Sequence, residues 1–527
     1  MSENQPKQSR LGPVAGVGRR IQVAGVVIIA ILVGLGYGYA RPAASASTAH
    51  SALSATTSPV DSAEVVCPVV KDLKNTNITT FTPTTVAGTG TAVETVTQLS
   101  QSSSSGQSKT ILTAGAPGTL ASAQGVSGSS LSINDPSDPV VAKVSGPDAP
   151  GFTVTESLAG GSGAEAGVAS ENCGSPDTDF WFTGLGTDKD PFALLNLVNA
   201  DSIPASVNIT VYTTNGALTG NSATALQGVT LTAGSESYEL ISTLAGNQNA
   251  PYAVHVVATV GRVSAAVLDY DGDNTGRGRD FIGAQKAAST LVMPGIPQAE
   301  DNEKVELSLL APDGPASVSL RWVGKSTITP ATGSFSGELD EGKVTTVDLS
   351  TVANAGEYAA LEVCGSSSGA NQCLPVTGDN GPTDVVGEVE ITQSDNSGQD
   401  TAYITPVSAL TGDGIVADNP LASVLTLTNT GTSTATVKVT LTPNGKSPTP
   451  VTSTVTVPAG TTVAQPLTTP KGASDYALTV TPVSGSVYAA RIAGTGHQLT
   501  IQSMSTAAET VTIPAVDQDV SGLVPQN

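Results

Sequence analysis

Aromatic and histidine side chains are scarce in this chain of 527 residues. Aromatic residues make up 4% of it, and there are three histidines, His50, His255 and His497. So few rings argue against a stacking platform for nucleic-acid bases and against a sugar-binding cleft lined with aromatic side chains. No two histidines have the spacing of metal ligands, so the sequence does not favour a zinc site.

Positive charge is also scarce, and much of it lies at one end. The first 41 residues hold five basic side chains and one acidic one, whereas the rest of the chain holds 17 basic and 44 acidic residues. A surface with this excess of negative charge repels phosphate backbones and other anionic polymers. We therefore expect no nucleic-acid partner.

Catalytic motifs are also few. The segment Gly365–Gly369 fits the pattern G-x-S-x-G. A nucleophile elbow, however, requires a strand-to-helix turn that is followed by an acid and then a histidine. This segment joins two expected strands, and His497 alone of the histidines follows it. We expect no catalytic residue and a protein that is not an enzyme.

One long uncharged run stands near the N-terminus. Residues 21–40 would span about 30 Å as a helix, which is the thickness of the hydrocarbon core of a bilayer. Arg19 and Arg20 precede the run and favour a cytoplasmic N-terminus. The sequence predicts a single-pass signal anchor with the C-terminal ectodomain outside the cell membrane. The alternative is secretion after signal cleavage at residues 44–46, Ala-Ser-Ala.

The four cysteines then lie in an exported region, where disulfides are permitted. Cys364 and Cys373 are close in sequence, so their pairing is the simplest. That leaves Cys67 to pair with Cys173.

Internal repetition is the strongest signal in the ectodomain. Three segments alternate apolar and mostly polar residues, which is typical of half-buried strands. Each follows another expected strand, and each precedes a glycine and then a Tyr-Ala pair at similar offsets. The alternating segments are Ala205–Val211, Ala316–Trp322 and Ala435–Leu441, the glycines are Gly234, Gly342 and Gly460, and the tyrosines are Tyr252, Tyr358 and Tyr476.

The repeated unit is roughly 110 residues long and has about seven expected strands, which fits an immunoglobulin-like or fibronectin-like sandwich. We therefore predict an all-β fold of tandem sandwich repeats after one transmembrane helix. The N-terminal β segment could be a diverged fourth sandwich or extra strands on the first repeat. The predicted parts are a basic cytoplasmic tail (1–20), the apolar helix (21–40), an Ala/Ser/Thr-rich linker (41–63), the N-terminal β segment (64–175), repeats one to three (176–274, 275–396 and 397–515) and a C-terminal tail (516–527).

Acidic residues gather after the first repeat. Asp269, Asp271, Asp273 and Asp280 occupy positions 1, 3, 5 and 12 of an oxygen-donor calcium loop. The sequence therefore indicates a calcium site that stiffens the joint between repeats one and two. The alternative is an acidic linker between repeats that Arg277 and Arg279 neutralise. Apart from calcium we expect no cofactor.

One stretch resembles a known family. It comprises Cys173, Asp177–Gly186, Leu194–Asn199 and Ala205–Val207. These residues resemble domain-of-unknown-function family 5719, although Ala200 stands where that family usually has proline. The resemblance implies an actinobacterial cell-envelope setting and no assigned activity.

These observations favour a non-enzymatic cell-envelope protein that displays sandwich domains outside the membrane, as a binding surface or a spacer. An accessory subunit that holds an envelope enzyme or a glycopolymer at the cell surface is the alternative. An exported hydrolase is the third interpretation.

The predicted orientation can be tested with protease added to spheroplasts. Because the basic flank holds the N-terminus inside, we expect the ectodomain to be degraded while a cytoplasmic marker protein survives. Full protection of the ectodomain would contradict the predicted orientation.

Overall fold

The computed structural model describes residues 55–513 with internal gaps. The gaps are 70–74, 84–91, 100, 103–112, 115–117, 125–127, 161–165, 187–190, 221–222, 225, 242–250, 272–277, 298–302, 332–334, 354–356, 367–381, 395–397 and 445–448. The chain divides into two compact units, and all that follows concerns the unit Ser58–Val511. No helix among the described residues is long and apolar enough to cross a membrane. The predicted helix 21–40 and Cys373 lie outside the described residues.

The N-terminal β segment forms two sheets of its own with an apolar core between them. One sheet has the strand order β2 (Ser62–Cys67), β9 (Val140–Ser145), β4 (Val93–Gln98), β7 (Gly118–Gln124). The other has the order β8 (Ser130–Asn134), β3 (Thr76–Phe81), β10 (Thr153–Ala159), β11 (Val168–Asn172). The short elements β5 (Gln101–Ser102), β6 (Thr113–Ala114) and η1 (Gly146–Asp148) also belong to this stretch.

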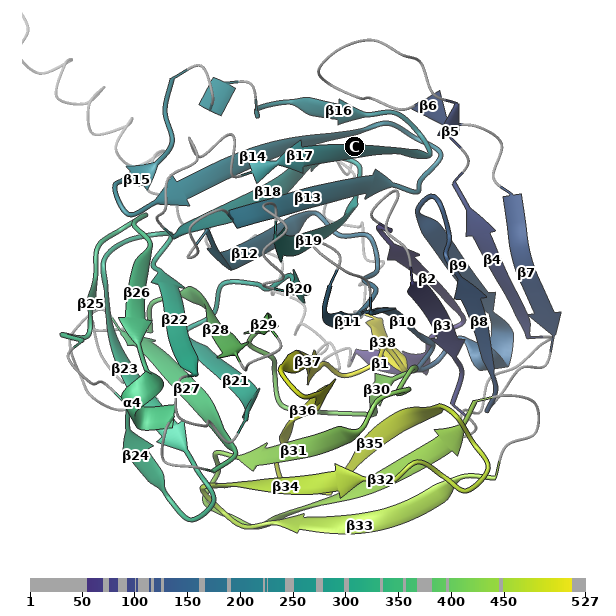
Figure 1. Cartoon of the computed structure of the whole chain (residues 1–527). Coiled ribbons are helices and arrows are strands. Elements are labelled where there is room, and N and C mark those ends of the chain that lie inside the picture. The colour runs from purple at the N-terminus through teal and green to yellow at the C-terminus, as the bar shows by residue number, and fades with distance from the viewer. Residues whose placement is uncertain are drawn as a thin grey trace, which may run out of the picture. The chain divides into compact units, whose positions relative to one another are not determined.

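The three repeats have the same strand order (Figure 1). The first sheet of repeat one has the strand order β12 (Asp179–Leu185), β18 (Tyr252–Val260), β14 (Ala205–Thr213), and both β15 (Gly216–Ala217) and β16 (Val229–Leu231) pair with β14. Its second sheet has the order β17 (Ser235–Leu240), β13 (Pro191–Asn199), β19 (Ser264–Asp271), β20 (Arg279–Ile282).

The first sheet of repeat two has the strand order β21 (Thr290–Ile296), β27 (Ala359–Ser366), β23 (Ala316–Val323), and both β24 (Ile328–Pro330) and β25 (Glu338–Leu339) pair with β23. Its second sheet has the order β26 (Thr345–Asp348), β22 (Lys304–Leu310), β28 (Val386–Ser394), β29 (Gln399–Ile404). The short helix α4 (Ser350–Ala353) follows β26.

Repeat three has the sheets β30 (Gly414–Val416), β35 (Tyr476–Ser484), β32 (Ala435–Pro443), β33 (Val451–Val457) and β34 (Thr461–Leu467), β31 (Ser423–Asn429), β36 (Tyr488–Thr495), β37 (Gln498–Met504).

The predicted alternating strands are confirmed as β14, β23 and β32. In β14, for example, Ala205, Val207, Ile209 and Val211 are buried, and the residues between them are half-buried. This alternation places one face of each strand in the core between the two sheets. Each sandwich has such an apolar core.

The strand order differs from that of an immunoglobulin domain. There the last strand lies in the sheet of the third and sixth strands. In repeat one, β19 instead pairs with β13 in the opposite sheet, and β20 extends that sheet. The same holds for β28 with β29 and for β36 with β37.

The predicted repeat boundaries at 274 and 396 lie before these added strands. β20 pairs with β19, and β29 pairs with β28, so both strands belong to the sandwich that precedes the predicted boundary. The strands on either side of the acidic segment are therefore neighbours in one sheet. The predicted position of the segment between two repeats was wrong, because charge alone does not distinguish a linker between domains from a connection between two strands.

The disulfide between Cys67 and Cys173 is confirmed, and it lies in the core of the N-terminal sandwich. Cys364 is also disulfide-bonded. Its predicted partner Cys373 is outside the described residues.

The last strands of the four sandwiches contact one another in a closed cycle. β11 contacts β20, β20 contacts β29, β29 contacts β37, and β37 contacts β11. Figure 1 shows these strands close together, with the other strands of each sandwich farther out.

The carboxylate of Asp400 lies at the centre of this cycle. It accepts hydrogen bonds from the backbone N–H groups of Thr401 at 3.1 Å and Leu499 at 2.9 Å. It also accepts from the N–H groups of Arg279 and Val168. These four donors belong to β29, β37, β20 and β11, so one side chain bonds to all four sandwiches. The four hydrogen bonds replace part of the water that the carboxyl loses on burial, although burial still raises its pKa to about 7.

A glycine lets the Asp400 carboxylate approach the backbone beside β20 closely. At Gly278, which has φ +90°, a Cβ atom would lie 1.7 Å from Asp400 Oδ1. An L side chain there would also be strained at that positive φ.

We predict that Gly278→Ala lowers the free energy of unfolding by roughly 2–4 kcal/mol, because it adds backbone strain and displaces a buried hydrogen-bonded carboxylate. Urea unfolding with the disulfides intact measures this loss. Gly160→Ala is the matched control, since Gly160 has φ +93° and a Cβ there would meet nothing within 4 Å. Equal losses in the two variants would contradict a role for the contact with Asp400.

Candidate functional site

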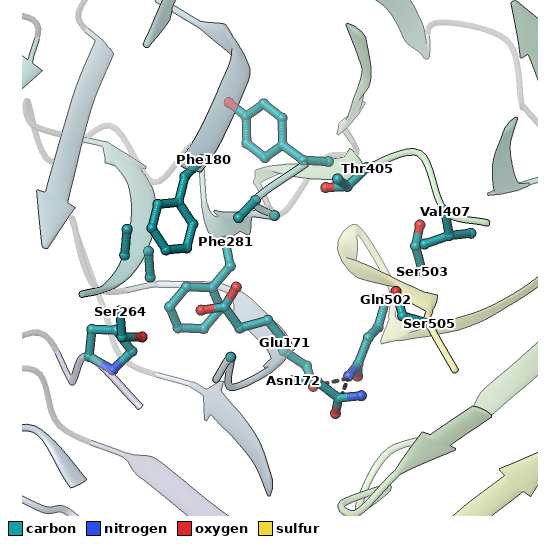
Figure 2. Close-up of a pocket in the computed structure, with 18 of the residues that line it drawn as sticks. Glu171, Asn172, Phe180, Ser264, Phe281, Thr405, Val407, Gln502, Ser503 and Ser505 are labelled. Atoms are coloured by element: carbon teal, nitrogen blue, oxygen red, sulfur yellow. Dashed lines mark hydrogen bonds between the residues drawn. The ribbon is translucent and has the colours of Figure 1, made fainter. Parts of the chain in front are cut away.

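A cavity of about 220 Å³ lies beside the cycle of last strands. All four sandwiches contribute to its wall, mostly from these strands or from the residues that follow them. Figure 2 shows how the side chains converge from these elements. The lining residues used below are Ser170, Glu171, Asn172, Phe180, Phe281, Tyr403 and Gln502.

A larger hollow of about 550 Å³ adjoins the cavity. The two share Phe180 and Val407 in their walls. Asp177 and Lys286 line the hollow, and the Lys286 ammonium lies 2.9 Å from Asp177 Oδ2. Both side chains are about half exposed, so this ion pair contributes little to stability.

Three aromatic rings line the cavity, namely those of Phe180, Phe281 and Tyr403. The hydroxyl of Tyr403 donates a hydrogen bond to Asp269 Oδ2 at 2.6 Å. The low aromatic content of the sequence argued against a sugar-binding cleft lined with aromatic side chains, yet the structure brings three rings to one cavity wall. A composition average cannot show that residues from separate repeats come together.

A chain of amide and hydroxyl groups forms another part of the wall. Gln502 Nε2 donates to Asn172 Oδ1 at 2.8 Å, and Gln502 Oε1 accepts from Ser170 and Arg491, each at 3.1 Å. Arg491 is buried. This network joins the last strand of the N-terminal sandwich to that of repeat three, so it holds both sides of the cavity.

Glu171 is the acidic side chain of the cavity wall. Burial raises its pKa well above the ordinary value, and the charges of Glu156 and Asp280 raise it further. These effects favour the neutral form of the carboxyl, which both donates and accepts hydrogen bonds. Together with the amides, hydroxyls and rings, it makes a wall that suits an uncharged polar ligand.

The structure describes the side chains of two of the four predicted calcium ligands, Asp269 and Asp280. Asp269 and Asp280 face each other across the paired strands β19 and β20. Asp280 is buried, and its Oδ1 accepts from the Phe281 N–H at 2.9 Å and from Thr500 Oγ1 at 3.2 Å. Asp273 and the side chain of Asp271 lie outside the described residues. Calcium binding therefore stays a prediction.

Among the described residues, one group of three side chains of the kinds that bind metals has its ligand atoms within 4.8 Å of one another. It consists of Cys67, Glu156 and Cys173, whose sulfur atoms form the disulfide. The serine of the G-x-S-x-G segment that would be the nucleophile, Ser367, lies outside the described residues.

His255 has partners that the sequence did not reveal. Its ring stacks on Trp181 with centroids 3.8 Å apart, and its Nε2 lies 2.7 Å from Asp179 Oδ1. Sequence reasoning also missed Glu171, Asn172 and Gln502. They belong to the added last strands, which the seven-strand expectation left out.

A family profile described as "Family of unknown function (DUF5719)" matches residues 119–468. The chain belongs to this family. The DUF5719 match includes Glu171, Phe281 and Tyr403 of the cavity wall but ends before Gln502. No curated protein matches the chain.

Among solved structures, a crystal structure described as the tetra-tandem repeat in the extending region of a large adhesion protein is 14% identical to this DUF5719 protein. The alignment covers 86% of this chain and 100% of that one, with a TM-score of 0.10. A likeness this low carries no conclusion about fold or function.

We predict that the protein is more stable at pH 5 than at pH 8. Burial raises the pKa of Asp400 to about 7 and that of Glu156 to about 8. A carboxyl whose pKa is raised on folding stabilises the folded state while it is protonated, and this stability is lost as the pH rises through the folded pKa. The contribution of each group is on the order of a few kcal/mol.

Thermal unfolding between pH 5 and pH 9 checks this prediction. Glu156→Gln should reduce the decrease in melting temperature, because the amide is neutral throughout. Glu341→Gln at an exposed site should leave the decrease unchanged. A melting temperature that rises from pH 5 to pH 8 would contradict the prediction.

Proposed function

We propose that this protein is a non-enzymatic component of an actinobacterial cell envelope, anchored by residues 21–40, whose sandwiches display a binding surface outside the membrane. The binding surface is the cavity together with the adjoining hollow. The observation that carries this proposal is that residues from all four sandwiches line one cavity.

Compactness favours display over spacing. A spacer gains length when its domains follow one another in a line. Here the first and last sandwiches contact each other through β11 and β37, and residues Ser58–Val511 form one compact unit. This arrangement is shorter than four sandwiches in a line would be, but it creates a composite surface to which all four sandwiches contribute.

The lining favours an uncharged polar partner. Amide, hydroxyl and aromatic groups hydrogen-bond and stack with such a ligand without a cost for burying charge. The cavity alone is smaller than a typical ligand pocket, so a bound segment would extend into the hollow. A neutral glycopolymer segment fits this description. An accessory subunit that holds an envelope enzyme is the second candidate, because Asp177 and Lys286 in the hollow offer charged contacts for a protein.

Photo-crosslinking in intact cells tests the proposal. A photoreactive residue replaces Ser408, which is exposed and lines the hollow. We expect one specific adduct, and its composition identifies a glycopolymer or a protein.

The matched control carries the same photoreactive residue at Val451, which is 52% exposed in β33, away from the residues that line the hollow. If both positions give the same adducts, or if neither gives any, the surface does not bind a partner and the spacer interpretation is favoured.

A further inference from the structure

Thr183 and Gln285 form a buried hydroxyl–amide pair in repeat one. Thr183 is 1% exposed and Gln285 is 6% exposed. Gln285 Nε2 lies 3.2 Å from Thr183 Oγ1, and its amide carbon Cδ is one covalent bond farther along the side chain. Two backbone hydrogen bonds between Gln285 and Trp181, at 3.0 and 3.1 Å, fix the position of Gln285 beside β12. The hydroxyl oxygen is therefore held no more than about 4.5 Å from the amide carbon, and proximity of this kind favours an intramolecular acyl transfer.

The carbonyl of this amide is polarised by a backbone donor. The N–H of Gly387 donates to Gln285 Oε1 at 3.0 Å. A donor at this position strengthens as negative charge develops on the oxygen during attack on the carbon.

A buried carboxyl group lies against the backbone of Thr183. Glu388 is 0% exposed, and it accepts hydrogen bonds from the backbone N–H of Thr183 and from Thr405 Oγ1, the latter at 2.9 Å. Burial raises its pKa well above the ordinary value, with further increases from Asp280 and Glu390. Such a carboxyl is suited to relaying a proton between two neighbouring groups.

A β-bulge aims the hydroxyl into this site. The pairing of β12 with β18 shifts register between Phe182 and Leu185, and Gly184 within the bulge has φ +77°. Bulges of this kind redirect side chains and are frequent beside active sites.

We propose that Thr183 and Gln285 form an intramolecular ester cross-link in a reaction that Glu388 assists. Thr183 Oγ1 attacks Gln285 Cδ, and the new C–O bond replaces the Cδ–Nε2 bond. The hydroxyl proton passes through Glu388 to the leaving nitrogen, which departs as ammonia. The reaction is redox-neutral and needs no other reactant. Exclusion of water from the three buried groups then protects the ester from hydrolysis.

The equivalent joint between repeats two and three is an internal comparison. Its bulge contains Pro294 and Gly295, where Gly295 has φ +99°. The N–H of Val407 donates to Val292 O at 2.9 Å, as Gln285 donates to Trp181. Hydroxyl and amide are thus replaced together, by Pro294 and Val407.

The acid is replaced as well. A Cβ at Gly184 would lie 3.8 Å from that of Glu388, and a Cβ at Gly295 would lie 2.7 Å from that of Ala490. Ala490 therefore takes the place of Glu388. The fold and the bulge persist without the three reactive groups, so these groups are not required to build the joint.

The cross-link goes beyond the proposed binding function. It would join the first strand of repeat one, β12, to the segment that follows the last strand, β20. Repeat one would then be closed covalently, and a pulling force on the chain would bypass its sheets.

The test is the intact mass of the purified full-length chain, denatured and with its disulfides reduced. We expect a mass about 17 Da below that of the sequence, which is the loss of one ammonia. Peptide sequencing by mass spectrometry should find Thr183 and Gln285 in one joined peptide pair. Alkaline hydroxylamine, which cleaves esters and leaves amides intact, should separate the pair. A full sequence mass, or a loss of ammonia located at other residues, would overturn the proposal.

Variants distinguish the chemistry from a merely structural role. Thr183→Val should abolish the mass loss, Thr183→Ser should retain it, and Glu388→Gln should slow its appearance at least about 100-fold. Thr426→Val is the matched control and should retain the mass loss, because Thr426 is a buried hydroxyl of repeat three whose hydrogen bond goes to Ala490 O. The result for the wild-type chain stands even if a variant fails to fold. Cross-linking at the wild-type rate in Glu388→Gln would overturn the role of Glu388.

Discussion

The Asp400 carboxylate must be satisfied by donors from four strands that are far apart in sequence, and the rest of the arrangement depends on this requirement. A buried carboxylate is costly to desolvate unless hydrogen bonds replace its water. Thr401 supplies one donor from its own strand, and Arg279, Leu499 and Val168 supply the others. These donors converge only when β11, β20, β29 and β37 meet. The last strand of each sandwich is therefore the element that joins the sandwiches.

The candidate site follows from the same convergence. Because each last strand ends near the centre of the cycle, the residues on and after it come together from distant parts of the chain. Glu171 and Asn172 follow from β11, Phe281 from β20, Tyr403 from β29 and Gln502 from β37. The hydrogen bond between Gln502 and Asn172 connects the last sandwich, through β37, to the first, through β11. A change at the centre should therefore affect both the stability of the joint and the shape of the cavity.

The sequence predicts the strands whose pattern is local and fails where pairing is distant. Ala205–Val211 and its two counterparts alternate with period two, which a sheet with one buried face imposes. Cys67 and Cys173 were paired correctly by elimination. In β20, however, all four residues Arg279–Ile282 are buried, and two of them are charged. Thr500 Oγ1 of repeat three donates to Asp280, and the Arg279 N–H donates to Asp400 of repeat two. These partners are distant in sequence, so nothing in the segment itself shows that it is a strand. The acidic residues around it were consequently taken for a linker.

Repetition also explains why chemistry can differ between equivalent joints. The joints at β12 and β21 share one geometry, in which a bulge in the first strand of a sandwich faces the segment after its last strand. The backbone hydrogen bonds of Gln285 and Val407 are alike, whereas their side chains are an amide and an alkyl group. The backbone pairing therefore sets the position, and the side chains are free to vary without loss of the fold. Where a hydroxyl, an amide and a carboxyl occupy such a position together, burial that the fold already provides excludes water and raises the carboxyl pKa. A reactive site can thus arise at one joint of a repeated architecture through side-chain changes alone.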